Sequence, residues 1–363
     1  MCTARVLQLS AGHAHTLALL GNGSVWSWGR GDCGQLGYGK PEAALQPGAA
    51  GSRPRQVEAL PPTVNIAAGG NHSLVVGWDG SVLGFGLHGR GQLGLGGGEA
   101  GSGAGPHHTF EPMLVVGLSH VRAWLVTCGA SHSAVVVQPI GPVLSACTQR
   151  VSSVYTFGRN DEGQLGLGTL HDTFHPSPPA LAAPPVLLAA AGAAHTVLCD
   201  SSGEVWTCGS NRQGQLGVRV GSDAWQDRFV RVAVRSPLTL PVHVVQLSCG
   251  SSHTCAVSAS GELFAWGAGR AGQVGVLPPR ERTPEPKRIA SLPPVATVDC
   301  GSLHTVVLTS DRRLFSWGSG TGGCLGQGPS VKRALVPTAT GAVSFDLLSV
   351  APVLTRGRTK VYQ

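Results

Sequence analysis

Short apolar runs alternate with glycine-rich turns along most of the chain. Thr16–Leu20 and Val25–Trp28 are two such runs, and the turn Gly21-Asn22-Gly23 separates them. Apolar runs of this length on either side of a turn that contains Asn and Gly predict a β-hairpin. A second pair of strands is expected from a proline-containing segment and from the segment that precedes the next hairpin, as in Pro286–Ile289 and Val295–Asp299. The pattern predicts an all-β protein.

The hairpin recurs six times, and each copy carries the same two motifs. The first motif reads Gly-x-x-His followed by Ser or Thr and an apolar strand, and its histidines are His15, His72, His132, His195, His253 and His304. The second motif is an aromatic residue and a glycine, followed by a turn that closes in Gly-Gln-Leu-Gly or a near variant. The glycines that follow the aromatic position are Gly29, Gly86, Gly158, Gly209, Gly267 and Gly318. In the fourth copy, Cys208 stands in place of the aromatic residue.

The spacing of the two motifs is constant except in one copy. The aromatic position follows the motif histidine by 13 residues in five units, as from His15 to Trp28. In the third unit the separation is 25 residues, from His132 to Phe157. We therefore expect an insertion at about 138–152, inside the third hairpin.

Four short strands in a unit of about fifty to sixty residues are typical of a propeller blade. Each unit has too little core to fold alone, so its sheet must pack against its neighbours. We predict a single β-propeller over residues 1–363 with seven blades, six complete and the seventh degenerate or shared between the termini. Residues 335–363 echo part of a hairpin but lack both motifs. Six blades is the alternative.

The composition agrees with strands joined by tight turns. Glycine, with 53 residues, occurs at about twice its average usage of about 7%. Only 12% of the residues are charged, whereas 42% are apolar. Residues 96–108 include a Gly- and Ser-rich stretch that predicts a flexible loop.

The cysteines and histidines do not predict a metal site. There are ten cysteines but no Cys-x-x-Cys pair, which argues against structural zinc. Five cysteines align with Ala, Leu or Val of other repeats and are expected to act as small core hydrophobes: Cys128, Cys199, Cys249, Cys255 and Cys300. Histidines in polar loops lack a second set of ligands: His107, His108, His171 and His175.

The net charge of +7 is a mild excess, and no basic run exceeds two residues. This argues against a dedicated nucleic-acid site and favours the recruitment of an acidic protein partner. No signal peptide precedes the first repeat, and the apolar stretch 186–199 is interrupted by Gly192 and His195. We expect a monomer in the cytoplasm or nucleus that is neither secreted nor inserted into a membrane.

In these paired motifs, the chain resembles the regulator of chromosome condensation repeat family, whose members form seven-bladed propellers. The resemblance covers almost the whole chain. The family includes an exchange factor for the GTPase Ran, a plant ultraviolet-B photoreceptor, modules of ubiquitin ligases and interaction scaffolds. It implies that each motif histidine has a structural role and bonds the neighbouring backbone.

The exchange factor carries an acid or a second histidine directly before the repeat histidine in two of its blades. The same positions here hold neither residue type: Ala14, Asn71, Ser131, Ala194, Ser252 and Leu303. Only His13, one step earlier, places a spare imidazole nearby. The resemblance therefore gives little support for Ran exchange by the known machinery.

Photoreception and dinucleotide binding are not supported either. The photoreceptor's absorbing tryptophans lie two residues before the repeat histidine, where this chain has no tryptophan. Three turns match Gly-x-Gly-x-x-Gly, beginning at Gly29, Gly267 and Gly318. A dinucleotide site needs a helix after this motif, and no helical pattern follows any of the three.

The candidate partner-binding residues lie where the repeats differ. The connection 218–236 contains Trp225, Arg228, Phe229, Arg231 and Arg235. Trp and Arg are enriched at binding hot spots, although Trp225 and Phe229 could instead cap the adjacent blade. Trp78, at a hairpin tip, and His13 are further candidates.

These observations predict a non-catalytic protein-interaction scaffold without a cofactor. Loop variation on a rigid ring is the common route by which such scaffolds acquire partners. The alternative is a guanine-nucleotide exchange factor or regulator for a Ran- or Rab-type small GTPase.

Overall fold

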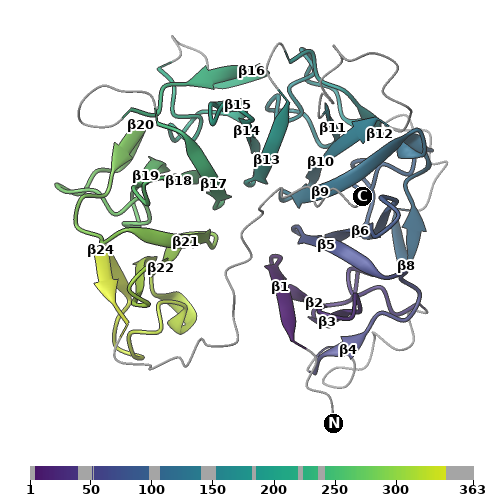
Figure 1. Ribbon diagram of the computed structural model, residues 1–363, viewed down its shortest axis with the longest axis horizontal. Coiled ribbons are helices and arrows are strands. Elements are labelled where there is room, and N and C mark those ends of the chain that lie inside the picture. Colours follow the sequence, from purple (N-terminus) through teal and green to yellow (C-terminus); the bar gives the residue numbers. More distant parts are fainter. Residues whose placement is uncertain are drawn as a thin grey trace, which may run out of the picture.

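The computed structural model describes residues 5–39, 51, 53–97, 107–139, 153–181, 185–219, 224–235 and 242–340. Within these residues, six four-stranded sheets are arranged around a common centre (Figure 1). We number them blades 1 to 6 in chain order. In each blade the strands are antiparallel and hydrogen-bonded in sequence order, and the first strand lies nearest the centre (Figure 1).

The strands occupy equivalent places in the six blades. The innermost strands are β1 (Val6–Ala11), β5 (Thr63–Ala68), β9 (Val121–Cys128), β13 (Val186–Ala191), β17 (Val244–Cys249) and β21 (Val295–Cys300). The second strands are β2 (His15–Leu20), β6 (His72–Gly77), β10 (His132–Pro139), β14 (His195–Asp200), β18 (His253–Ser258) and β22 (His304–Thr309). The third strands are β3 (Val25–Gly29), β7 (Val82–Leu87), β11 (Ser153–Gly158), β15 (Val205–Ser210), β19 (Leu263–Ala268) and β23 (Leu314–Ser319). The outer strands are β4 (Arg55–Gln56), β8 (His108–Leu114), β12 (Thr173–Ser177), β16 (Trp225–Val232), β20 (Arg282–Arg288) and β24 (Arg333–Ala339). Two short 3-10 helices are η2 (Val116–Leu118) and η3 (Thr321–Gly323).

The prediction of seven blades is wrong, because the sheets number six in the described part of the chain. Arg333–Ala339 overlaps the start of the expected seventh blade, but it pairs with β23 as the outer strand of blade 6. The outer strand follows the Gly-Gln-Leu-Gly turn in every repeat, so this segment completes the sixth unit. The rest of the expected seventh blade, 341–363, lies outside the described residues.

Two other predicted features fall mostly outside the described residues. The expected insertion at 138–152 lies between the end of β10 at Pro139 and the start of β11 at Ser153. Of the expected loop 96–108, residues 98–106 are not described, and His108 begins strand β8.

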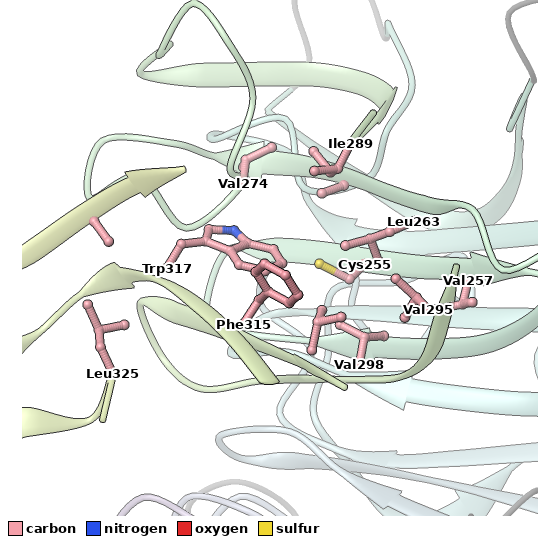
Figure 2. Packing of buried hydrophobic residues seen from close by; sticks show 13 residues of the cluster. Cys255, Val257, Leu263, Val274, Ile289, Val295, Val298, Phe315, Trp317 and Leu325 are labelled. Carbon is pink, nitrogen blue, oxygen red and sulfur yellow. The ribbon is translucent and has the colours of Figure 1, made fainter. Parts of the chain in front are cut away.

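The core is divided among the contacts between neighbouring blades. Buried apolar side chains form five clusters, one between each successive pair from blades 1 and 2 to blades 5 and 6. Figure 2 shows the last of these, in which Phe315 and Trp317 of blade 6 pack near Cys255 of blade 5. The blades therefore stabilise one another, as expected for a repeat whose units cannot bury their own faces.

Strand register places both motifs at one side of the ring. His15 at the start of β2 is paired with Gly29 at the end of β3, and the same pairing recurs in the other five blades. The Gly-x-x-His turns and the aromatic-glycine turns thus share one side, which we call the motif face. The β2–β3 type hairpin turns lie on the opposite side, which we call the hairpin face.

Candidate functional site

The motif histidines connect neighbouring blades. In five of them the imidazole Nε2 lies 2.9–3.0 Å from the Ser or Thr hydroxyl that follows the motif histidine of the next blade. The pairs are His15–Ser73, His72–Ser133, His132–Thr196, His195–Thr254 and His253–Thr305. The expectation that these rings bond neighbouring backbone is therefore wrong for these five histidines, because the partner of Nε2 is a side-chain hydroxyl of the next blade.

The hydroxyl in each pair also fixes which nitrogen of the histidine carries the proton. Ser73 donates its one hydroxyl hydrogen to the backbone oxygen of Gln35, at 2.9 Å, in the Gly-Gln-Leu-Gly turn of blade 1. Its oxygen is then left to accept from His15, so Nε2 of His15 carries the hydrogen. Equivalent hydroxyl-to-glutamine bonds occur at the other four junctions. One hydroxyl is thus held by two groups of the preceding blade, and we call this arrangement the clamp.

Burial keeps four of the clamp histidines neutral. It lowers the pKa of His72 and His195 to about 3 and the pKa of His15 and His132 to about 4. A cation in an apolar layer would lose its hydration without an acid to pair with. These histidines therefore act as uncharged donors between blades.

The aromatic residue of the second motif strengthens the same junction. Trp266 and Trp317 donate their indole Nε1 hydrogens to the backbone oxygens of Gln215 and Gln273, each at 2.9 Å, in the preceding blade. The last glycine of the Gly-Gln-Leu-Gly turn makes room for these rings. At Gly275, φ is +72° and a Cβ would lie 2.6 Å from Nε1 of Trp317.

Phe229 belongs to this framework and not to a partner-binding surface. Its side chain is only 8% exposed and lies in the cluster between blades 3 and 4. A Cβ on Gly166 would meet its ring at 2.4 Å and the sulfur of Cys208 at 3.2 Å. Phe229 thus fills the space that the aromatic residue occupies in other blades and that Cys208 leaves empty. Its prediction as a contact residue is wrong for this physical reason.

The Gly-x-x-His turns on the motif face carry small or neutral side chains before the motif histidine. His13 is exposed there, and its backbone nitrogen donates to the oxygen of Gly69 at 3.1 Å. Leu303, in blade 6, is 45% exposed. These turns therefore offer one imidazole and one apolar side chain to a partner, but no carboxylate.

Charged side chains surround these turns, and in blades 2 to 4 they form ion pairs. Arg90 of blade 2 has its Nε 2.9 Å from Asp172 and its Nη2 3.5 Å from Asp161 of blade 3. Arg212 of blade 4 lies 3.2 Å from Glu162, also of blade 3. Positive and negative charges therefore neutralise one another across this part of the motif face.

In blades 5 and 6 the same region is basic. Five exposed cations lie on the turns and at the start of the outer strands, and we call them the basic surface: Arg270, Arg280, Arg282, Lys332 and Arg333. Within the described residues none of them forms an ion pair. Glu281 is the one acid in these turns and strand starts.

The predicted contact residues do not form one surface. Trp225 begins β16 on the motif face and is half-buried, whereas Arg231 pairs with Glu204 near the hairpin face. Arg228 is exposed, and its guanidinium packs against Gly168 of blade 3. A Cβ on Gly168 would lie 2.6 Å from Nη2 of Arg228. Trp78 is 73% exposed on the hairpin face.

The sequence did not single out the basic surface. Arg282 and Arg333 occupy the first position of an outer strand, directly opposite Ala268 and Ser319. The corresponding part of blade 3 carries Asp172. Comparing charges at aligned positions could have revealed this difference, but a search for basic runs could not, because the cations come from separate segments.

One group of ligand-type side chains is present in the described part of the chain. The ligand atoms of His253, Cys255 and Cys300 lie within 4.8 Å of one another between blades 5 and 6. Burial raises the pKa of the Cys300 thiol well above its usual value, which disfavours the thiolate that a metal would need. His253 is already engaged with Thr305, so the group fits a packing role.

No helix among the described residues is long and apolar enough to cross a bilayer.

Comparison with known proteins identifies the repeat. A family model described as the regulator of chromosome condensation (RCC1) repeat matches residues 22–76, 79–136, 152–199, 202–257 and 260–308. A second model of this repeat matches 6–35, 188–215, 244–273 and 295–324. Together these matches run through all six blades.

Relatives include the ultraviolet-B receptor UVR8 of Arabidopsis thaliana, 30% identical over 399 aligned residues that cover 94% of this chain and 83% of the receptor. The human regulator of chromosome condensation is 37% identical over 184 residues, 49% of this chain and 41% of the regulator. The human probable E3 ubiquitin-protein ligase HERC6 is 32% identical over 87% of this chain, but this match covers only 29% of the ligase.

Solved structures show the same fold. Yeast RCC1 (Prp20), in a complex with Kap60, superimposes with a TM-score of 0.75 at 23% identity, covering 94% of this chain and 76% of that one. Human WBSCR16 gives a TM-score of 0.71 at 25% identity, covering 87% and 79%. With family models matching most of its length and the paired motifs placed at the blade junctions, the chain belongs to the regulator of chromosome condensation repeat family.

Proposed function

We propose that this chain is a non-catalytic scaffold that binds protein partners through its motif face. The proposal is supported mainly by one contrast: the clamp recurs at five junctions, whereas the exposed turns differ from blade to blade. Surfaces that vary on a rigid framework are where binding residues usually lie. We expect the scaffold to act as a monomer in the cytoplasm or nucleus.

The outer strand of blade 4 contributes to the proposed surface. Trp225 and Arg228 have the side-chain types that dominate binding hot spots, and Arg228 is exposed. In a cell extract, tagged protein with Trp225→Ala and Arg228→Ala should capture less partner while its thermal unfolding midpoint stays nearly unchanged. Lys287→Ala with Arg312→Ala, at exposed cations away from the motif-face turns, is the matched control. Loss of folding in the double variant, or equal loss in the control, would contradict this assignment.

Regulation of a small GTPase is the second candidate. It is favoured by the exposed imidazole of His13 on the motif face and by the similarity to the human regulator of chromosome condensation. The test is release of a fluorescent guanine nucleotide from a panel of Ran- and Rab-type GTPases, with wild-type protein and with His13→Ala. Faster release that depends on His13 would favour regulation over the scaffold.

A further inference from the structure

Hydrogen bonds join the basic surface into one continuous region across blades 5 and 6. Arg333 of blade 6 donates from Nη2 to the backbone oxygen of Arg270 in blade 5, at 2.6 Å. The backbone nitrogen of Gly269 donates to the oxygen of Glu281, which places Arg282 beside the same turn. Arg282 in turn reaches the oxygen of Asn211 in blade 4, at 3.3 Å.

The arginine groups in this region contact backbone oxygens where their counterparts contact carboxylates. Arg90 in blade 2 spans the junction with blade 3 and meets Asp172, whereas Arg333 spans the junction between blades 5 and 6 and meets the backbone oxygen of another arginine. Among the described residues, none of the five cations forms an ion pair: Glu281 lies between Arg280 and Arg282, and Glu285 of β20 is bound to Arg219 of blade 4. Their positive charge is available to a partner because no carboxylate in the described part of the chain forms an ion pair with them.

Apolar and aromatic side chains border the cations. The backbone oxygen of Leu303 accepts from Ser319, the residue paired with Arg333, and the Leu303 side chain is 45% exposed. Leu277, in the loop that leads to Arg280, is 71% exposed. On the opposite border, the oxygen of Ala224, next to Trp225, accepts from Asn211.

From this arrangement we infer that the basic surface binds an acidic protein segment that carries large apolar side chains among its carboxylates. Arginine guanidinium groups bind carboxylates with two parallel hydrogen bonds, and the exposed leucines match apolar residues of such a segment. A single nucleic-acid strand would instead require several aromatic stacking platforms along a basic groove. Among the described residues, Trp225 is the aromatic residue at this border, and it is half-buried.

This inference rests on the proposed scaffold function and names its partner class. The experiment measures fluorescence anisotropy of a short labelled peptide of Glu and Asp with two leucines, titrated with the full chain. A peptide with Gln and Asn in place of the acids and a labelled single-stranded oligonucleotide serve as comparison probes. We expect the acidic peptide to bind, its affinity to fall with added salt, and both comparison probes to bind more weakly.

Arg270→Glu with Arg333→Glu should weaken binding of the acidic peptide by about tenfold or more, because two attractive charges become repulsive. The matched control is Lys287→Glu with Arg312→Glu, which changes the net charge equally at exposed cations outside the basic surface. If the reversal variant unfolds at a lower temperature, Arg270→Gln with Arg333→Gln replaces it. Leu303→Ser should weaken binding by a few-fold.

Three outcomes would overturn the inference: no binding of the acidic peptide, tighter binding of the oligonucleotide, or equal loss in the charge-matched control. Capture of partners from an extract separates this inference from the scaffold proposal. If wild type and Arg270→Glu/Arg333→Glu capture the same proteins, the basic surface is wrong while the scaffold stands. If wild type captures no protein, the scaffold proposal itself fails.

Discussion

The junction between blades 5 and 6 and the turns just beside it are built from the same repeat but differ in how closely they match the other blades. Inside the junction, Thr305 is held by His253 and by the backbone of Gln273, as the equivalent hydroxyl is at four other junctions. On the motif face, Arg270 and Arg333 have no acidic partner among the described residues, whereas Arg90 of blade 2 pairs with Asp172 of blade 3. The buried contacts of the clamp recur from junction to junction, whereas the charged side chains on the motif face differ between blades.

This difference follows from what burial demands. A buried polar group must find a partner or lose the hydrogen bonds that water would give it, so the five described junctions repeat the same solution. An exposed arginine is solvated whether or not an acid is near, and a surface ion pair contributes only about 0–1 kcal/mol. Side chains on the motif face are therefore free to differ between blades and to serve binding.

Acid should affect the buried layer most strongly. Since burial lowers the pKa of His15, His72, His132 and His195 to about 3–4, the unfolded chain takes up protons below about pH 6.5 while the folded chain does not. The contribution of these histidines to the free energy of unfolding is fully present above about pH 6.5 and is lost as the pH falls toward 4. Each histidine contributes up to about 1.4 kcal/mol per pH unit.

Urea unfolding between pH 8 and pH 4 measures this loss. His132→Asn, which keeps a side-chain donor but cannot take up the proton, should make the decline less steep while lowering stability at pH 8. A decline of unchanged steepness would contradict the assignment of the buried histidines as the acid-sensitive groups.

Removal of an aromatic side chain tests whether the motif matters equally where the side chain is fully buried and where it is half-buried. Trp317→Ala should lower the free energy of unfolding by about 3–5 kcal/mol, because the ring is fully buried and bonds the backbone of Gln273. Trp28 holds the same motif position in blade 1 but is only half-buried, so Trp28→Ala should cost clearly less. Equal losses in chemical denaturation would show that the junction is not what stabilises the ring.

The smallest effect is expected for single arginines on the motif face. Arg90→Ala removes ion pairs with Asp161 and Asp172 and should cost less than about 1 kcal/mol, most of it lost in high salt. Arg270→Ala should leave stability unchanged, since no internal acid pairs with it among the described residues. A destabilising Arg270→Ala would mean that this arginine belongs to the framework.

The repeat was predictable because its signals are local. Turn residues, apolar runs and fixed motif spacing predicted the hairpins, and the structure places each motif histidine at the start of a second strand. The blade count was mispredicted because the outer strand carries no motif, so Arg333–Ala339 could be assigned to either the sixth or a seventh unit. Hydrogen bonding to β23 decides for the sixth.

The candidate site was less predictable because it depends on contacts between distant segments. Trp225 and Phe229 looked alike in the sequence, as aromatic residues in a variable connection. Phe229 proved to be core because Cys208 leaves a space over Gly166 that only a neighbouring strand can fill. No local pattern carries that information.

By itself, the sequence determined an all-β repeat, its family and the residues that recur, because hairpin formation depends on neighbours along the chain. Only the tertiary structure decided how many sheets form, that the histidines bond hydroxyl groups of the next blade, and which arginines meet acids. Those outcomes depend on which residues of successive blades face one another. That arrangement is set by the packing of whole sheets and not by any single segment.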